Sequence, residues 1–242
     1  MIGSSSNLRK VPADTCLKER DSEGKPITPK ATVRLLGGYI DSKLSWEKHI
    51  TGAEKSVTKV VTGKLNALRI AAKHFPSKQK LNLANGLIMS TISYLIQCWG
   101  FSTKNYAKKI QTLQNSAARF VFNMGMRTNI CKLMTGCKWL TVRQLTARQS
   151  LMTLWTTVRT KNCHSLQSRI KNDGILFVQS RTMGADRLKP NSLRKIKSRQ
   201  NWQGMSITWW NRLPTYIRIE TNKLTFKREI TKWIKNNIPM RF

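Results

Sequence analysis

The spacing of apolar positions predicts a short β element at the start of the chain, followed by a series of helices. Val33, Leu35 and Gly37 alternate with Arg34, Leu36 and Gly38, and the run closes on Tyr39 and Ile40, which is the pattern of a strand with little room for bulk at its middle. Turn-forming residues at 21–27 predict a hairpin that leads into this strand. Asp41 is expected to be a turn residue and an anion at the helix entry, with Ser45 as the N-cap.

From residue 45 to residue 124 the apolar positions recur about every 3.6 residues, which predicts helices over 45–75, 77–99 and 103–124. The middle helix is apolar on most sides and is expected to be buried. The other two combine an apolar face with a basic or amide face. On the first helix the second face carries Lys48, Lys55, Lys59, Arg69 and Lys73, together with Gly52 and Gly63. On the third it carries Lys104, Lys108, Gln111, Asn115 and Arg119.

The second half predicts further helices separated by irregular segments. A capping box, Thr141 with Gln144, opens one helix, and two more are predicted at 204–212 and 224–238. The basic stretch 180–200 fits either a strand pair or an irregular arm.

The fold class predicted from these patterns is mainly α, with an N-terminal β-hairpin or strand element, a helical bundle and a mostly helical C-terminal domain. The predicted domain boundaries are 1–44, 45–126 and 127–242.

The charge of the chain indicates that the basic helix faces are more than ordinary solvated surface. The 242 residues hold 44 Lys and Arg against 11 Asp and Glu, a net charge of +33, and residues 55–172 contain no acidic residue. A merely solvated helix face usually mixes both signs, so a span this long without acids favours a surface that faces phosphate. We therefore predict nucleic acid, as RNA, DNA or an RNA/DNA hybrid, as the partner.

The same sequence offers little for catalysis. Nucleotidyl transfer needs carboxylates that hold two metal ions, and the five Asp residues are scattered. Asp41 has no acidic neighbour with which to act, and His49, His74 and His164 are interpreted as structural or exposed. The five cysteines match neither a disulfide framework nor a common zinc spacing. We predict no catalytic residue, metal or cofactor, and no enzymatic activity for the isolated chain.

No apolar run is long enough for a membrane span, and the N-terminus lacks the apolar core of a signal peptide. These features predict an intracellular protein, nuclear or cytoplasmic, that is not secreted and has no membrane partner.

Several segments in fixed order carry a resemblance: LLGGYIDSKLSWEKHI, SYLIQCWG, IQTLQNSAARFVF, KWLTVRQL, WWNRLPTYIR and TFKREITKWIK. Together they resemble the C-terminal half of the reverse transcriptases of non-LTR (LINE-like) retrotransposons, most closely the animal elements that end without a further nuclease domain. The resemblance extends over nearly the whole chain, from about Met1 to Trp233.

The resemblance implies a role for each part. Leu36, Gly37 and Gly38 would form the primer grip, which supports the 3′ end of the primer, and the helices after them would form the thumb, which clamps the template-primer duplex. The LQN-x-A-A-R and W-N-x-L-P segments would belong to the region after the thumb. The paired aspartates of the palm, the fingers, the endonuclease and any zinc knuckle are absent, so magnesium would be needed only by a catalytic domain that this chain lacks.

The leading hypothesis is a truncated or fragmentary reverse transcriptase that binds template-primer, with the palm and fingers of a longer polyprotein as a partner. The alternatives are a domesticated RNA-binding protein without catalysis and a non-functional translated transposon remnant. The predicted nucleic-acid-binding residues are Leu36, Gly37, Gly38, Lys48, Lys55, Lys59, Arg69, Lys73, Lys104, Lys108, Asn115 and Arg119.

Trp209 and Trp210 allow two interpretations. Adjacent indoles can stack on bases, but a segment that ends in Leu213-Pro214 more often anchors a core. We favour the core.

Overall fold

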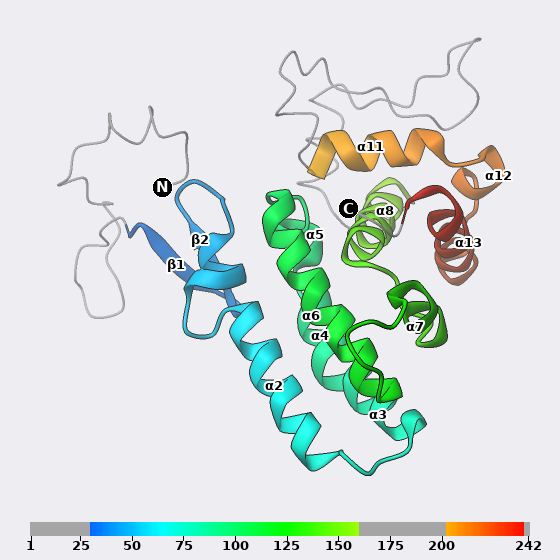
Figure 1. Cartoon of the computed structure of the whole chain (residues 1–242). Helices are drawn as coiled ribbons and strands as arrows, with labels where there is room; N and C mark the ends of the chain where they lie inside the picture. Colours follow the sequence, from blue (N-terminus) through cyan, green and yellow to red (C-terminus); the bar gives the residue numbers. More distant parts are fainter. Residues whose placement is uncertain (1–29, 160–201, 240–242) are drawn as a thin grey trace, which may run out of the picture. The chain divides into compact units, whose positions relative to one another are not determined.

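A computed structural model describes residues 30–159 and 202–239, and within them the chain is mainly helical with an N-terminal β-hairpin, as predicted (Figure 1). The chain divides into two compact units, 1–74 and 75–242. The domain boundaries predicted after residues 44 and 126 do not coincide with this division and stay predictions. The hairpin predicted at 21–27 and the basic stretch 180–200 lie outside the described residues.

In the first unit the described elements are two strands, a π-helix and an α-helix: β1 (Thr32–Leu35), β2 (Gly38–Asp41), η1 (Lys48–Gly52) and α2 (Val57–Ala71). In the second unit they are α3 (Ser77–Leu83), η2 (Ala84–Met89), α4 (Ser90–Ser93), α5 (Ile96–Trp99), α6 (Lys104–Phe122), α7 (Ile130–Gly136), α8 (Val142–Arg159), α11 (Trp202–Arg212), α12 (Thr215–Arg218) and α13 (Lys223–Asn237).

The prediction of one strand through residues 33–40 is wrong, because the chain folds back on itself within that run. β1 and β2 pair antiparallel, with Leu35 opposite Gly38, so Leu36 and Gly37 form a two-residue turn. Both turn residues have positive φ, 46° at Leu36 and 82° at Gly37, as a type I′ hairpin turn requires. Gly37 adopts this conformation without strain, whereas Leu36 does so at a cost and is 83% exposed.

The predicted continuous helix over 45–75 is also wrong, because residues 53–56 separate η1 from α2. Asp41 acts at the helix entry as predicted: its carboxylate accepts hydrogen bonds of 3.0 Å each from the backbone N–H groups of Ser45 and Trp46. Ser45 is not the N-cap; that position is Glu47, whose N–H donates to Ser45 Oγ at 3.3 Å. The polar run around Ser56 ends the first helical segment and begins α2.

The predicted buried helix over 77–99 consists of α3, η2, α4 and α5. Leu95 adopts a left-handed conformation (φ 53°), which breaks the helical path between α4 and α5. Ile88 and Ile92 are fully buried, but Leu87 and Tyr94 are 40% and 47% exposed. The segment therefore buries one side only, which corrects the expectation of burial on most sides.

Helix α6 corresponds to the predicted helix over 103–124, and its burial departs from the predicted outer face most at Gln111. The Gln111 side chain is only 8% exposed, and its Oε1 accepts a 2.9 Å hydrogen bond from the Val142 N–H. Gln114, fully buried, donates from Nε2 to the Leu140 carbonyl at 2.8 Å. These two amides fix α6 to the chain that enters α8.

The capping box predicted at the start of α8 is confirmed. The Thr141 N–H donates to Gln144 Oε1 at 3.1 Å, and the Gln144 N–H donates to Thr141 Oγ1 at 3.3 Å. Gln144 Nε2 also donates to the Ile238 carbonyl at 2.8 Å. One side chain thus caps α8 and holds the end of α13 beside it.

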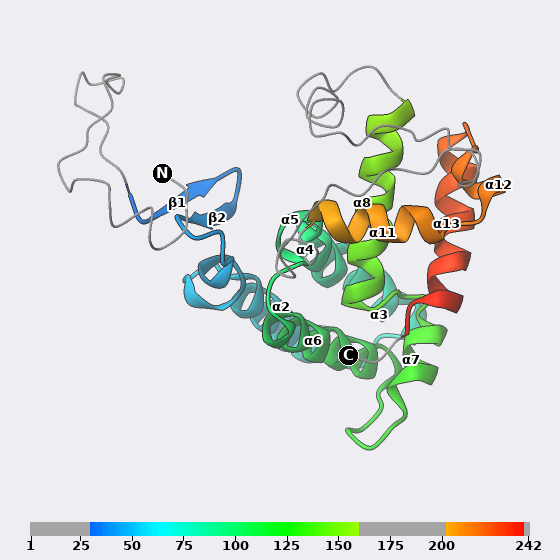
Figure 2. The same ribbon diagram turned by 90° about the horizontal axis from the view of Figure 1, so that it is seen from above.

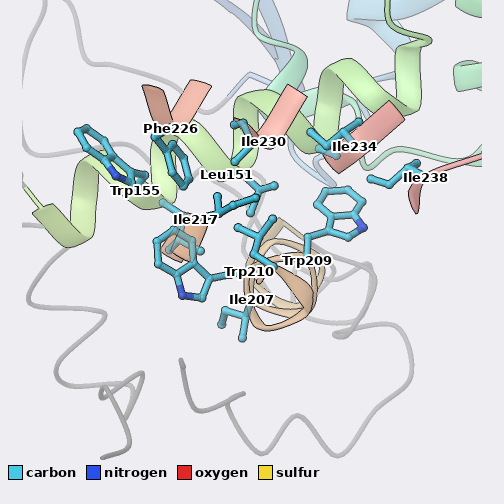
Figure 3. Close-up of a cluster of buried hydrophobic side chains, with 13 residues drawn as sticks. Leu151, Trp155, Ile207, Trp209, Trp210, Ile217, Phe226, Ile230, Ile234 and Ile238 are labelled. Atoms are coloured by element: carbon cyan, nitrogen blue, oxygen red, sulfur yellow. The ribbon is translucent and has the colours of Figure 1, made fainter. Parts of the chain in front are cut away.

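Helices α8, α11 and α13 enclose the C-terminal core. Helix α13 lies beside α8, and α11 runs across α8 (Figure 2). Figure 3 shows Leu151 of α8 among the side chains of α11 and α13. Trp209 and Trp210 are 5% and 0% exposed, so the structure places both in the core, as favoured from the sequence. The core contains Ala147, Leu151, Leu154, Trp155, Ile207, Trp209, Trp210, Leu213, Ile217, Phe226, Ile230, Ile234 and Ile238.

Candidate nucleic-acid interface

A line of exposed residues follows one side of α2, and we call it the α2 stripe. Its cations are exposed, while the opposite side buries Val57, Val61 and Leu65. Arg69 is oriented by its Nη1, which donates to Asn66 Oδ1 at 3.3 Å. The stripe comprises Lys55, Lys59, Gly63, Asn66, Arg69, Ile70 and Lys73. No acidic residue lies within the α2 stripe.

Two residues of the α2 stripe, Gly63 and Ile70, carry no charge but have other notable features. A Cβ built on Gly63 would meet no atom within 4 Å, so packing within the protein does not require a glycine there. The missing side chain at this open position would let a ligand backbone approach α2 closely. Ile70 is 82% exposed among the cations. In the sequence its only sign is that it falls outside the apolar face of the helix.

The predicted primer-grip residues lie on the hairpin. Leu36 and Gly37 form its exposed tip, whereas Gly38 is buried at the start of β2. The Arg34 guanidinium carbon lies 5.7 Å from the centre of the Tyr39 ring, which covers one face of the hairpin. An exposed apolar tip of this kind can contact a sugar-phosphate chain through van der Waals contacts. The contact of this tip with a primer stays a prediction.

The predicted residues of α6 divide into two groups. Lys104 and Lys108 are exposed. Asn115 and Arg119 are half-buried and bonded to the protein: Asn115 Oδ1 accepts from Gln111 Nε2 at 2.8 Å, and Arg119 Nη2 lies 3.4 Å from the Met126 carbonyl oxygen. Asn115 also lines a pocket of about 320 Å³ between α6, α7 and the start of α8.

The described residues that line this pocket are neutral, so none of them offers a cation to phosphate. The lining residues are Gln111, Asn115, Asn129, Ile130, Cys131, Met134 and Thr141.

The remaining predicted cation is Lys48 in η1. It is exposed and belongs to the first unit, as the α2 stripe does.

The electrostatics of Asp41 fit a structural role. Burial disfavours the carboxylate, but the hydrogen bonds from the Ser45 and Trp46 N–H groups outweigh it and lower the pKa of Asp41. The carboxylate is therefore ionised at neutral pH and already bonded within the hairpin-to-η1 connection.

The Cys137 side chain is buried. Burial raises the pKa of the Cys137 thiol to about 11, so this cysteine is protonated and unreactive at neutral pH. Within residues 30–159 and 202–239, His, Cys, Asp and Glu side chains nowhere gather in threes that could hold a metal ion. Over the same residues, no helix is both long and apolar enough to cross a membrane.

We expect His49 to make the first unit sensitive to acid. Its side chain is 3% exposed, neither ring nitrogen has a hydrogen-bond partner, and burial lowers its pKa. In the unfolded chain the imidazole titrates near its ordinary pKa of about 6.5. Below that pH the unfolded state binds a proton that the folded state resists, so stability is full above about 6.5 and is lost as pH falls towards the folded pKa.

We expect hydrogen exchange of the η1 amides to accelerate between about pH 7 and pH 5.5, beyond the intrinsic pH dependence of exchange. His49→Leu should remove the extra acceleration, and His74→Leu, at an exposed histidine, should keep it. Equal profiles for wild type and His49→Leu would show that the buried imidazole is not the cause.

About half of the chain is similar to a reverse transcriptase. A Drosophila melanogaster protein described as "Probable RNA-directed DNA polymerase from transposon X-element" is 29% identical over 138 residues, which cover 53% of this chain and 13% of that relative. The chain thus contains a reverse transcriptase-like region and spans a small part of the relative. No family model and no solved structure matches the chain.

Proposed function

We propose that this chain binds template-primer nucleic acid through the α2 stripe and the hairpin tip, as a non-catalytic portion of a retrotransposon reverse transcriptase. The observation that carries the proposal is the α2 stripe, whose exposed cations have no acidic residue among them. It lies in a chain of net charge +33 that contains a reverse transcriptase-like region.

The physical basis is counterion release. Each Lys or Arg that neutralises a phosphate displaces condensed cations from the nucleic acid, so affinity increases with the number of contacts and falls with salt. Contacts of this kind hold a backbone without recognising base edges. The proposed role is therefore to position a duplex with little sequence preference.

The hairpin tip adds a neutral contact to this charged surface. Leu36 has a positive φ and is 83% exposed, and neither feature contributes to burial of the hairpin itself. We propose that the tip supports the primer strand while the α2 stripe holds the backbone of the duplex.

Polymerisation is not proposed for this chain alone. Two-metal nucleotidyl transfer requires clustered carboxylates, and the Asp residues at 14, 21, 41, 173 and 186 are isolated in sequence. Asp41 lies close to the hairpin tip in sequence, and its carboxylate accepts hydrogen bonds from the Ser45 and Trp46 N–H groups.

The proposal is tested by neutralising the α2 stripe. The α2 variant carries Lys55→Gln, Lys59→Gln and Arg69→Gln. The charge control carries Lys132→Gln, Lys138→Gln and Lys227→Gln, at exposed positions of the second unit. Both lose three charges. Fluorescence anisotropy with a labelled RNA–DNA hybrid at fixed salt should show affinity weakened about tenfold or more by the α2 variant and about twofold or less by the charge control.

Equal weakening by the two variants would contradict the proposal, because it would show a response to net charge and not to the α2 stripe. The wild-type preparation, supplied with magnesium and deoxynucleotides, should leave the primer unextended. Extension would overturn the non-catalytic part of the proposal. A strong preference for one cellular RNA over the hybrid would favour a domesticated RNA-binding protein.

A further inference from the structure

A polar pocket of about 480 Å³ opens where the ends of α11 and α13 meet the start of α8. Trp209 and Ile238, two of its residues, belong to the C-terminal core, and Figure 3 shows both at one end of the cluster. The pocket is lined by Arg143, Trp209, Asn211, Arg212, Leu213, Trp233, Asn237, Ile238 and Pro239. Its walls therefore continue a rigid core, and its mouth is polar.

Among the described residues that line the pocket, two are arginines and none is acidic. Arg143 and Arg212 are exposed, and neither guanidinium makes an ion pair or hydrogen bond within the described residues. Both groups are consequently available to an anion, and a guanidinium can donate two parallel hydrogen bonds to one phosphate.

The third component is an aromatic ring beside the cations. Trp233 is half-buried against the C-terminal core, and the Asn237 Nδ2 donates to its backbone carbonyl at 2.9 Å. This bond orients the Asn237 amide at the pocket. An indole held in a basic, amide-lined recess has the components with which proteins bind unpaired bases: a stacking surface, hydrogen-bonding amides and a cation for the backbone.

We propose that this pocket binds a single-stranded nucleotide, with a backbone phosphate on Arg143 and Arg212 and the base against Trp233. The inference rests on the proposed function and adds a second contact, for an unpaired strand, to the duplex contact of the α2 stripe. A duplex would not fill the pocket in this way, because its bases are stacked on one another and cannot reach an indole. The volume of about 480 Å³ lies within the range of small-ligand sites.

The charge part is tested with the full chain and a labelled ten-nucleotide oligouridylate. The double variant Arg143→Gln, Arg212→Gln should weaken binding and lower the log–log salt slope by about 1.4, the value for two contacts to a single strand. The double variant Lys132→Gln, Lys138→Gln removes equal charge outside the pocket and should leave the slope unchanged. Equal slopes for the two double variants would overturn the proposal.

The stacking part is tested at Trp233. Trp233→Leu keeps an apolar side chain against the core and should weaken oligouridylate binding about tenfold, whereas Trp233→Phe should restore most of it. Ultraviolet crosslinking of bromouridine-substituted oligonucleotide should attach it to the peptide that contains Trp233. Crosslinks confined to other peptides, or binding insensitive to both substitutions in folded protein, would overturn the proposal.

Failure of the pocket proposal can be distinguished from failure of the proposed function. Loss of oligouridylate binding in the pocket variants with hybrid binding retained supports the pocket. If the wild type binds oligouridylate at the pocket but fails to bind the hybrid, the proposed function fails and the pocket stands. If polyglutamate at matched charge competes as strongly as unlabelled oligouridylate, and Trp233→Leu has no effect, base recognition is contradicted.

Discussion

Replacing Trp210 with alanine should lower the free energy of unfolding of the second unit by about 3 to 5 kcal/mol. The Trp210 side chain is fully buried, and its ring centre lies 6.0 Å from that of Phe226. Phe226 in turn stacks on Trp155 at 5.5 Å. Truncation would leave a cavity beside the rings of Phe226 and Trp155, which α13 and α8 hold in place, and such a rigid site cannot collapse to fill it.

Chemical denaturation of the full chain measures this effect, and Tyr216→Ala is its control. Tyr216 is also aromatic, but it is 63% exposed, so its loss should change stability by about 0.5 kcal/mol or less. If Trp210→Ala kept wild-type stability and instead lost affinity for single strands, the indole would be a base-stacking group and the C-terminal core would be misassigned.

Raising the salt from about 50 to about 200 mM should weaken hybrid binding by roughly a thousandfold or more, if six to ten cations contact phosphate. The α2 stripe with Lys48 supplies five of these, and Lys104 and Lys108 are exposed on α6. The acid-free span from residue 55 makes so large a number plausible on one chain, because few carboxylates compete for the cations. Anisotropy titrations over this range measure the effect, and a change below about tenfold would indicate fewer than about two contacts.

Periodicity predicted the amphipathic elements well. The apolar positions of α2 and α6 are spaced at 3.6 residues, and the structure buries Val61, Leu65, Ile110 and Val121 accordingly. The Thr141–Gln144 box is a local signal and was found from four residues of sequence. Local signals of this kind depend only on neighbouring residues, so they can be recognised without the rest of the fold.

The errors arose where a pattern continues through a change of direction. The strand pattern continues through residues 33–40, so the glycine pair is the only sign in the sequence of the turn at Leu36-Gly37. The helix breaks near residues 53–56 and at Leu95 contain no proline, and helical periodicity across them conceals the interruption.

Long-range polar partners could not be predicted at all. Gln111 bonds Val142 across 31 residues, and Gln144 bonds Ile238 across 94. Arg218, 2% exposed, donates to the Leu213 carbonyl and lies inside the core despite its charge. The pocket at Arg143, Arg212 and Trp233 likewise joins three helices that are distant in sequence.

The central claim, that the α2 stripe holds phosphate, is tested most directly by the salt dependence of hybrid binding in three proteins. The wild type should give a log–log slope of order −5 to −9, and the α2 variant, which lacks Lys55, Lys59 and Arg69, should be less steep by about 2.7. The charge control should keep the wild-type slope. An α2 variant whose slope equals that of wild type would show that these three cations do not contact phosphate and would contradict the account.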